Sequence, residues 1–185
     1  MTLGLYFYVT AANIVFNPTY WNIVARHEYH YKTISKIVGA YNGCYGLAVT
    51  IFSLGIIRDY FYHLAIHSHP LYPTLEFPVL AALLFGLGNV LVLSSMYRLG
   101  VTGTYLGDYF GILMTKRVTG FPFNVSTSPM YTGSTMVFVG TALWYGSAVG
   151  LALSGLVLAC YQVALRLEDP FTTQIYASRT SQKRD

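Results

Sequence analysis

Charged residues are scarce in this sequence, and their scarcity decides its broad class. Only 10% of the 185 residues are charged, whereas a soluble domain carries about 25%. Hydrophobic residues make up 54%, and the mean hydropathy is +0.47. The composition excludes an ordinary soluble domain and indicates an integral membrane protein.

Basic charge is limited as well, with a net charge of only +4. The Lys and Arg residues stand at the ends of apolar runs, which suits anionic lipid head groups. No basic run is interleaved with aromatic residues. We therefore expect a membrane lipid as partner and no nucleic acid.

Cysteine and histidine give no sign of a metal site. Cys44 and Cys160 each lie within an apolar run and are expected to behave as small buried hydrophobes. His27 and His30 are three positions apart, not the four that a helical metal pair requires, and the other three histidines lie in a predicted loop. Hydrolase, kinase and metalloenzyme motifs are absent, so we expect no metal.

Two uncharged runs have the length of a membrane span. They cover residues 37–57 and 77–97, and each is close to the roughly 20 residues that a spanning helix needs. The segment between them, residues 58–76, contains charges, three histidines and two prolines. We expect this segment to be a loop.

The N-terminal stretch, residues 1–25, is uncharged but contains Asn17-Pro18. This dipeptide disfavours a straight helix, so a kinked or half-inserted intramembrane helix is expected. Trp21 and the neighbouring tyrosines suit the membrane interface. No small-residue cleavage site follows, and the stretch is interpreted as retained.

Residues 118–165 contain no charge at all. One alternative is a helical hairpin with spans at about 129–145 and 149–167, and the other is a single span at about 146–165. The hairpin is favoured because residues 136–145 are apolar and would be costly to expose to water. Only the hairpin brings Tyr131 and Glu168 to the same membrane face. The predicted fold class is all-α: a helical membrane bundle of the N-terminal helix plus three to four transmembrane helices.

A glycine-rich block from Arg98 to Gly133 interrupts the apolar pattern. Lipid cannot satisfy the backbone groups of such a block, so it is expected to line a watery ligand pocket. Its glycines between 100 and 111 recur at spacings of three and four, as on one helix face. Asp108 lies among them, and a carboxylate at membrane depth is a candidate functional residue.

Two further motifs have a structural and a functional interpretation. Glu168-Asp169 follows an apolar run and precedes Pro170, which is expected to end the helix. The carboxylates either bind a cationic ligand or form a solvated helix end. Gly86-Leu87-Gly88 is not a Rossmann fingerprint, because no strand precedes it. Its glycines either pack against another helix or admit a ligand.

Three segments together resemble a known family. They are LGVTGTYLGDYFGILMTKRVTGFPFNVSTSPMYTGST, FNPTYWNIVAR before it and ALRLEDPFTTQIYA after it. The chain closely resembles the phospholipid methyltransferases that make phosphatidylcholine, those of the fungal type most of all. The Pro129-Met130-Tyr131-Thr132-Gly133 element is similar to one that precedes a helical hairpin in isoprenylcysteine methyltransferases.

The resemblance implies S-adenosylmethionine as methyl donor and a non-Rossmann methyltransferase fold. It implies cofactor contacts at Gly86, Leu87 and Gly88 and at Glu168 and Asp169, although aspartate replaces the family's usual second glutamate. It further implies a multi-pass protein of the endoplasmic reticulum membrane, with a mitochondrial membrane as the other location. Basic residues near the C-terminus favour a cytosolic C-terminus.

The implied reaction is N-methylation of phosphatidyl-N-methylethanolamine and its dimethyl form to phosphatidylcholine. Phosphatidylethanolamine itself is an open third substrate. The alternatives are another membrane substrate, such as a prenylated cysteine, and a non-catalytic lipid-binding protein.

The lipid amine must lose a proton before it attacks. We expect Asp108 to accept or steer that proton, and Asn124 and Tyr131 to contact substrate. Aromatic rings can stabilise the positive charges of both substrates. The candidates are Tyr105, Tyr109, Phe110, Phe121, Phe123 and Tyr131.

Overall fold

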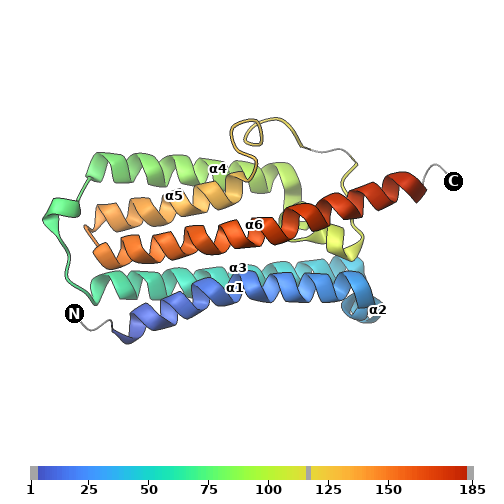
Figure 1. Ribbon diagram of the computed structural model, residues 1–185, viewed down its shortest axis with the longest axis horizontal. Helices are drawn as coiled ribbons and strands as arrows, with labels where there is room; N and C mark the ends of the chain where they lie inside the picture. The colour runs from blue at the N-terminus through green and yellow to red at the C-terminus, as the bar shows by residue number, and fades with distance from the viewer. Residues whose placement is uncertain (1–3, 116–117, 183–185) are drawn as a thin grey trace.

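The computed structural model describes residues 4–115 and 118–182, with side chains to residue 177. Every regular element in these ranges is helical (Figure 1). The elements are α1 (Leu5–Tyr31), α2 (Thr33–Val38), α3 (Ala40–His67), η1 (Pro73–Leu75), α4 (Pro78–Thr104), η2 (Gly107–Phe110), α5 (Pro129–Trp144) and α6 (Ala148–Gln182).

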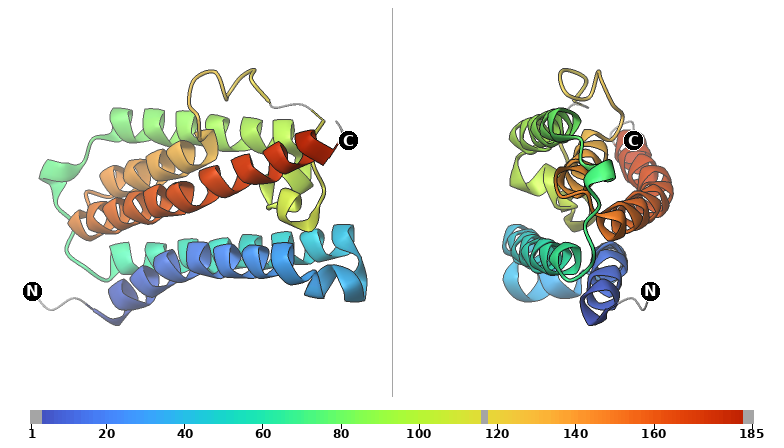
Figure 2. Two further views of the ribbon diagram at one scale, coloured as in Figure 1. Left: turned by 45° about the vertical axis from the view of Figure 1, so that its right-hand side comes forward. Right: turned by 90° about the vertical axis from the view of Figure 1, so that its left-hand side faces the viewer.

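The long helices form a bundle of two groups. Helices α1 and α3 lie side by side, and α4, α5 and α6 lie on the other side, with α5 between α4 and α6 (Figures 1 and 2). One end of the bundle carries α2, η2 and the C-terminal part of α6, and we call it the α2 end. The opposite end carries η1 and the turn between α5 and α6, and we call it the η1 end.

Three helices are long and apolar enough to cross a membrane: α3, α4 and α6. Much of their apolar surface faces outward; Val79 and Val49, for example, are 75% and 66% exposed. Such outward faces are stable in lipid but not in water. The predicted all-α membrane bundle is therefore confirmed.

Helix α1 is one element that contains Pro18 and bends along its length (Figure 1). It runs beside α3 from the η1 end to the α2 end. It is less apolar than the three candidate spans. Several polar side chains on α1 are buried, among them Thr10, Asn17 and Asn22, which shows that this helix carries polar groups into the bundle.

The turn from α1 to α2 depends on Glu28, which is fully buried. Its carboxylate accepts hydrogen bonds from the backbone N–H groups of Ile34 (2.7 Å) and Ser35 (3.1 Å) at the start of α2. Burial alone would raise the pKa of Glu28. The hydrogen bonds from Ser35 and Ile34 outweigh burial and lower the pKa below its ordinary value. Glu28 thus acts as a capping carboxylate for unpaired N–H groups.

The predicted loop at residues 58–76 is wrong in its first half, because α3 continues to His67. Arg58 does not end the helix because its charge is satisfied within the bundle. It pairs with Asp59 at 2.9 Å and donates to the hydroxyl of Tyr161 at 2.9 Å. Its guanidinium also lies 4.7 Å from the ring centre of Phe138. A charge with such partners is tolerated within a membrane helix.

The last two helices form a hairpin. Gly146 makes the turn between α5 and α6 with a φ of 61°, a conformation that glycine adopts at no steric cost. A side chain there would collide with the carbonyl of Tyr72. The Gly146 carbonyl accepts a 2.8 Å hydrogen bond from the Tyr72 N–H, which ties the turn to the η1 segment.

Pro170 does not end α6, which continues to Gln182, so that expectation is wrong. Proline removes one backbone hydrogen bond, and side chains donate to two other carbonyls of this part of α6. The hydroxyl of Thr173 donates to the carbonyl of Asp169 at 2.7 Å, and Arg26 donates to the carbonyl of Leu167 at 2.6 Å. The extended part of α6 can therefore cover the site at the α2 end.

Candidate active site

Glu168 is the centre of a hydrogen-bond network that joins three helices. Its Oε1 accepts from Trp21 Nε1 at 2.7 Å and from Asn22 Nδ2 at 3.0 Å, both on α1. Its Oε2 accepts from the hydroxyl of Tyr131, on α5, at 2.7 Å. Three donors fix both oxygens of one largely enclosed carboxylate, so its position is determined by α1, α5 and α6 together.

The donors around Glu168 are neutral. Within the described part of the chain, the one Lys or Arg side chain that forms an ion pair is Arg58, with Asp59. None of the three donors carries a positive charge, so they do not neutralise the carboxylate. The arrangement is therefore suited to stabilise a cationic ligand.

Asp108 lies in η2, beside Glu168 on the same side of α6. Its Oδ2 accepts from the hydroxyl of Thr172 at 3.1 Å, and its Oδ1 accepts from the N–H of Tyr109 at 3.2 Å. Thr172 follows Glu168 by four positions, so the two side chains share a face of α6. A second carboxylate is thereby directed to the same region.

The segment that carries Asp108 is not the continuous helix that the glycine spacing suggests. Gly100 and Gly111 have φ values of 64° and 83°, and Leu106 has 59°. These left-handed positions turn the chain at the end of α4 and around η2. The turn places η2, which carries Asp108 and Tyr109, between α6 and the α1–α3 pair (Figure 2).

Aromatic rings surround the two carboxylates. The rings of Tyr131 and Tyr161 lie 4.7 Å apart, and Tyr109 stacks on Phe171 at 5.0 Å. Tyr109 is 1% exposed and Trp21 7%. Aromatic faces attract cations, so these rings add to the preference of the site for positive charge.

Among the described residues, three buried polar atoms of α1 and η2 around this site have no hydrogen-bond partner. They are the side-chain carbonyl oxygens of Asn17 and Asn22 and the hydroxyl of Tyr109; the two asparagines are 3% and 7% exposed. Such atoms are costly unless a ligand or water donates to them. A cationic ligand that also carries amine or hydroxyl donors would satisfy them, and S-adenosylmethionine has this chemistry. The residues present thus fit the cofactor that the resemblance implies.

The structure brings together three of the residues singled out from the sequence: Glu168, Asp108 and Tyr131. Asp169 is exposed, on a neighbouring face of α6. Asn124 is exposed in the segment that precedes α5, so it lies outside this network.

The Gly86-Leu87-Gly88 motif lies in the middle of α4. Gly86 faces open space, and Leu87 is 55% exposed. Gly88 lies against Gly133 of α5, where an added Cβ would come 2.6 Å from the Gly133 carbonyl. This glycine pair lets α4 approach α5 closely, and α5 carries Tyr131. The motif therefore adjoins the site through α5, and a cofactor contact at these residues stays a prediction.

Several residues of the network were not assigned a role from the sequence, namely Trp21, Asn22, Tyr161 and Thr172. Trp21 was interpreted as an interface anchor. The available signal was the presence of Asn17, Trp21 and Asn22 on one uncharged helix, because polar groups in such a helix need partners inside the bundle.

Comparisons with known proteins identify the family of the chain. A family model described as phospholipid methyltransferase matches residues 77–179. The chain is 57% identical over 175 residues to a phosphatidyl-N-methylethanolamine N-methyltransferase of Saccharomyces cerevisiae, covering 92% of this chain and 85% of that protein.

Two other relatives extend the comparison. The enzyme of the same name from Emericella nidulans is 56% identical over 178 residues, covering 96% of this chain and 88% of that protein. Phosphatidylethanolamine N-methyltransferase of Homo sapiens is 46% identical over 179 residues, covering 95% of this chain and 90% of that protein. No solved structure matches the chain. The chain belongs to the phospholipid methyltransferase family.

Proposed function

We propose that this protein methylates the head-group nitrogen of phosphatidyl-N-methylethanolamine and phosphatidyl-N,N-dimethylethanolamine and so forms phosphatidylcholine. The names of its fungal relatives support these substrates. The names of its animal relatives support phosphatidylethanolamine as an additional substrate. The observation that carries the proposal is Glu168, a carboxylate held by three neutral donors among aromatic rings.

S-adenosylmethionine, when bound, supplies an electrophilic methyl group on a positively charged sulfur. The carboxylate of Glu168 balances the positive charge of the bound cofactor. Trp21, Asn22 and Tyr131 hold this carboxylate in place. The unpaired oxygens of Asn17 and Asn22 are available to amine or hydroxyl donors. Direct contacts by Gly86, Leu87, Gly88 and Asp169 remain part of the proposal as further cofactor contacts.

The lipid amine needs a base. An ammonium with a pKa near that of lysine is only about a thousandth neutral at pH 7. Asp108 accepts the proton, and the hydroxyl of Thr172 and the N–H of Tyr109 orient its two oxygens. The Tyr109 and Phe171 rings stabilise the quaternary ammonium as it forms. In the dimethyl substrate, a tertiary amine attacks in the same way.

The charge distribution supports a proposed orientation in the membrane. Most of the described Lys and Arg residues belong to segments near the α2 end. Arg26 and Arg98 are in the last two turns of α1 and α4, Lys32 and Lys36 are at α2, and Arg166 lines a hollow with Arg26, whereas Arg58 lies within α3. Membrane proteins keep such residues on the cytoplasmic side. We propose that the α2 end and the C-terminus face the cytosol. The membrane is that of the endoplasmic reticulum, as the family resemblance implies.

The test uses purified protein in mixed micelles. Phosphatidylethanolamine and its monomethyl and dimethyl forms are supplied separately with labelled S-adenosylmethionine, and methyl incorporation into each lipid is measured. We expect incorporation into the monomethyl and dimethyl lipids, and Glu168→Gln should abolish it. Asp169→Asn is the graded comparison: it removes the adjacent, exposed carboxylate, and as a peripheral cofactor contact this residue should retain more activity when neutralised than Glu168 does. Absence of incorporation into every lipid by the unaltered protein would refute the proposal.

A further inference from the structure

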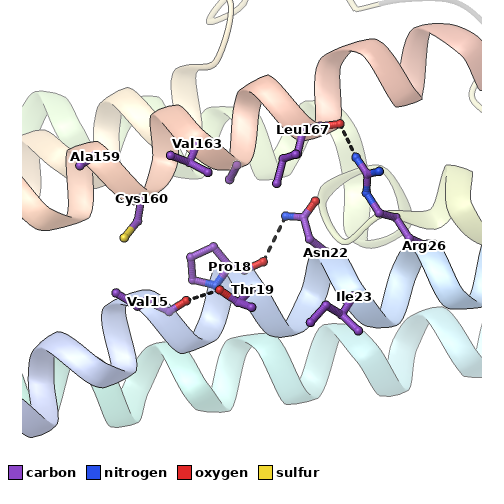
Figure 3. A pocket seen from close by; sticks show the side chains of 11 residues that line it. Val15, Pro18, Thr19, Asn22, Ile23, Arg26, Ala159, Cys160, Val163 and Leu167 are labelled. Atoms are coloured by element: carbon purple, nitrogen blue, oxygen red, sulfur yellow. Dashed lines mark hydrogen bonds between the residues drawn. The ribbon is translucent and has the colours of Figure 1, made fainter.

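An open groove runs along the outside of the bundle between α1 and α6 (Figure 3). Its volume is about 510 Å³, within the range of about 300–1,000 Å³ that ligand pockets occupy. The walls are largely apolar, with Val15, Pro18 and Ile23 from α1 and Ala159 and Val163 from α6. A groove of this kind on a membrane helix bundle accepts an acyl chain.

Arg26 and the carbonyl of Leu167 close the groove on its side toward the α2 end. Arg26 Nη2 donates to that carbonyl at 2.6 Å and so links α1 to α6 (Figure 3). Beyond this link lies a second hollow of about 240 Å³, which Arg26 and Leu167 also line together with Arg166. The apolar groove and the basic hollow therefore adjoin each other on the two sides of this link.

Neither arginine of this hollow is paired with a carboxylate in the described part of the chain. Arg26 donates to a neutral carbonyl and lies over the face of Phe171, 4.7 Å away. Arg166 is exposed and makes no ion pair with the residues that the structure describes. A phosphate would form stronger, charge-assisted hydrogen bonds with Arg26 than the carbonyl does. An apolar groove that ends at two guanidinium groups without a carboxylate partner among the described residues matches the order of groups in a phospholipid: acyl chain, then anionic phosphate.

The groove also adjoins the carboxylate network. Asn22 lines the groove and donates to Glu168 on its other side. The Phe171 ring lies between Arg26 and Tyr109, the neighbour of Asp108. A head group anchored by its phosphate at Arg26 therefore has its amine on the side of Phe171 and Asp108.

We propose that this groove is the side entrance of the lipid substrate, with one acyl chain between α1 and α6 and the phosphate held by Arg26 and Arg166. The phosphate replaces the Leu167 carbonyl as the partner of Arg26, which releases the link between α1 and α6 and lets the amine pass inward. The inference rests on the proposed function for the identity of the lipid, but the binding itself does not require catalysis.

Two variants test the two parts of the site. Ala159→Trp fills the apolar groove, and the double change Arg26→Gln with Arg166→Gln removes the charge. Each variant should raise KM for the phospholipid at least about tenfold. The double variant loses charge-assisted hydrogen bonds to the phosphate, and Ala159→Trp loses the packing of the acyl chain in the groove. KM for S-adenosylmethionine should change less than twofold. Ala152→Trp is the matched control, since Ala152 is exposed on α6 two turns nearer the η1 end and does not line the groove.

Photolabelling tests binding without any reaction. A phosphatidylethanolamine with a diazirine on one acyl chain, added without cofactor, should label the peptides around Val15–Ile23 and 159–167. Labelling should fall in the Ala159→Trp protein, persist in the Ala152→Trp protein, and be weaker with a diacylglycerol probe that lacks phosphate. Excess inorganic phosphate should not displace the lipid, which separates lipid binding from simple anion binding.

The outcomes distinguish this inference from the proposed function. Three results would refute the proposal that the groove admits the lipid. They are labelling confined to other helices, equal labelling in the two tryptophan variants, and a cross-linked pair of chains at this groove. If the protein labels as expected but methylates no lipid, the groove stands and the proposed function fails.

Discussion

Tyr131 and Glu168 are joined by a 2.7 Å hydrogen bond from the phenol hydroxyl to Oε2. They are 37 positions apart, and the α5–α6 hairpin is what brings them together. Tyr131 is two positions before Gly133, which packs on Gly88 of α4. Helix packing between α4 and α5 thus sets the position of a donor to the central carboxylate.

Replacement of Tyr131 by phenylalanine should weaken cofactor binding without unfolding the protein. The change removes one donor to a charged acceptor, worth about 1.5–3 kcal/mol, so KM for S-adenosylmethionine should rise about tenfold or more. Initial-rate kinetics at saturating lipid measure it. Tyr60→Phe is the control, because Tyr60 is 60% exposed on α3. An unchanged cofactor KM in Tyr131→Phe would show that this hydrogen bond does not serve the cofactor.

Replacement of Asp108 by asparagine should remove the base while keeping a similar shape. General base catalysis contributes about 10²–10⁴-fold, so kcat should fall by that order. Without a base the reaction depends on free amine, and the residual rate should rise about tenfold per pH unit below the amine pKa near 10. The pH–rate profile of each methylation step measures this. Full activity of Asp108→Asn with an unchanged profile would assign the proton to another acceptor.

The sequence predicted the membrane bundle because uncharged runs of membrane-spanning length are a strong signal. It also favoured the α5–α6 hairpin, because leaving residues 136–145 in water would be costly. The family resemblance was confirmed by the family model and by relatives that cover most of the chain. Asp108 and Glu168 were found by one rule, that a carboxylate near membrane depth needs a partner.

Other parts of the structure could not be predicted from local patterns. Arg58 was expected to end a helix, but Tyr161 and Phe138, about 80 to 100 positions away, satisfy its charge. Trp21 donates to Glu168 across 147 positions. Such partners are defined only when the helices pack. The extension of α6 beyond Pro170 likewise depends on contacts made by Phe171 and Thr172 with other elements.

The turn between α1 and α2 should make stability depend on pH. The folded pKa of Glu28 is lowered, so its contribution is full above the unfolded value of about 4.5 and is lost as pH falls through the folded pKa. Glu28→Gln should cost about 0.5–2 kcal/mol at neutral pH, as for the loss of a helix cap. The unfolding temperature should decrease less between pH 7 and pH 4 in the variant than in the unaltered protein. An equal decrease in the two proteins would assign the pH dependence of stability to other carboxyl groups.

The two glycines of the Gly86-Leu87-Gly88 motif should respond differently to alanine. At Gly88 the new methyl group would come 2.6 Å from the carbonyl of Gly133, and overpacking of this kind costs about 1–3 kcal/mol. At Gly86 nothing lies within 4 Å, so Gly86→Ala should leave the unfolding temperature nearly unchanged. Thermal unfolding and equilibrium binding of S-adenosylmethionine, measured on both variants, separate a packing role from a binding role. If Gly86→Ala keeps its stability but loses cofactor affinity, the motif contacts the cofactor. If only Gly88→Ala loses affinity, and in proportion to its loss of stability, the motif acts by holding α4 against α5.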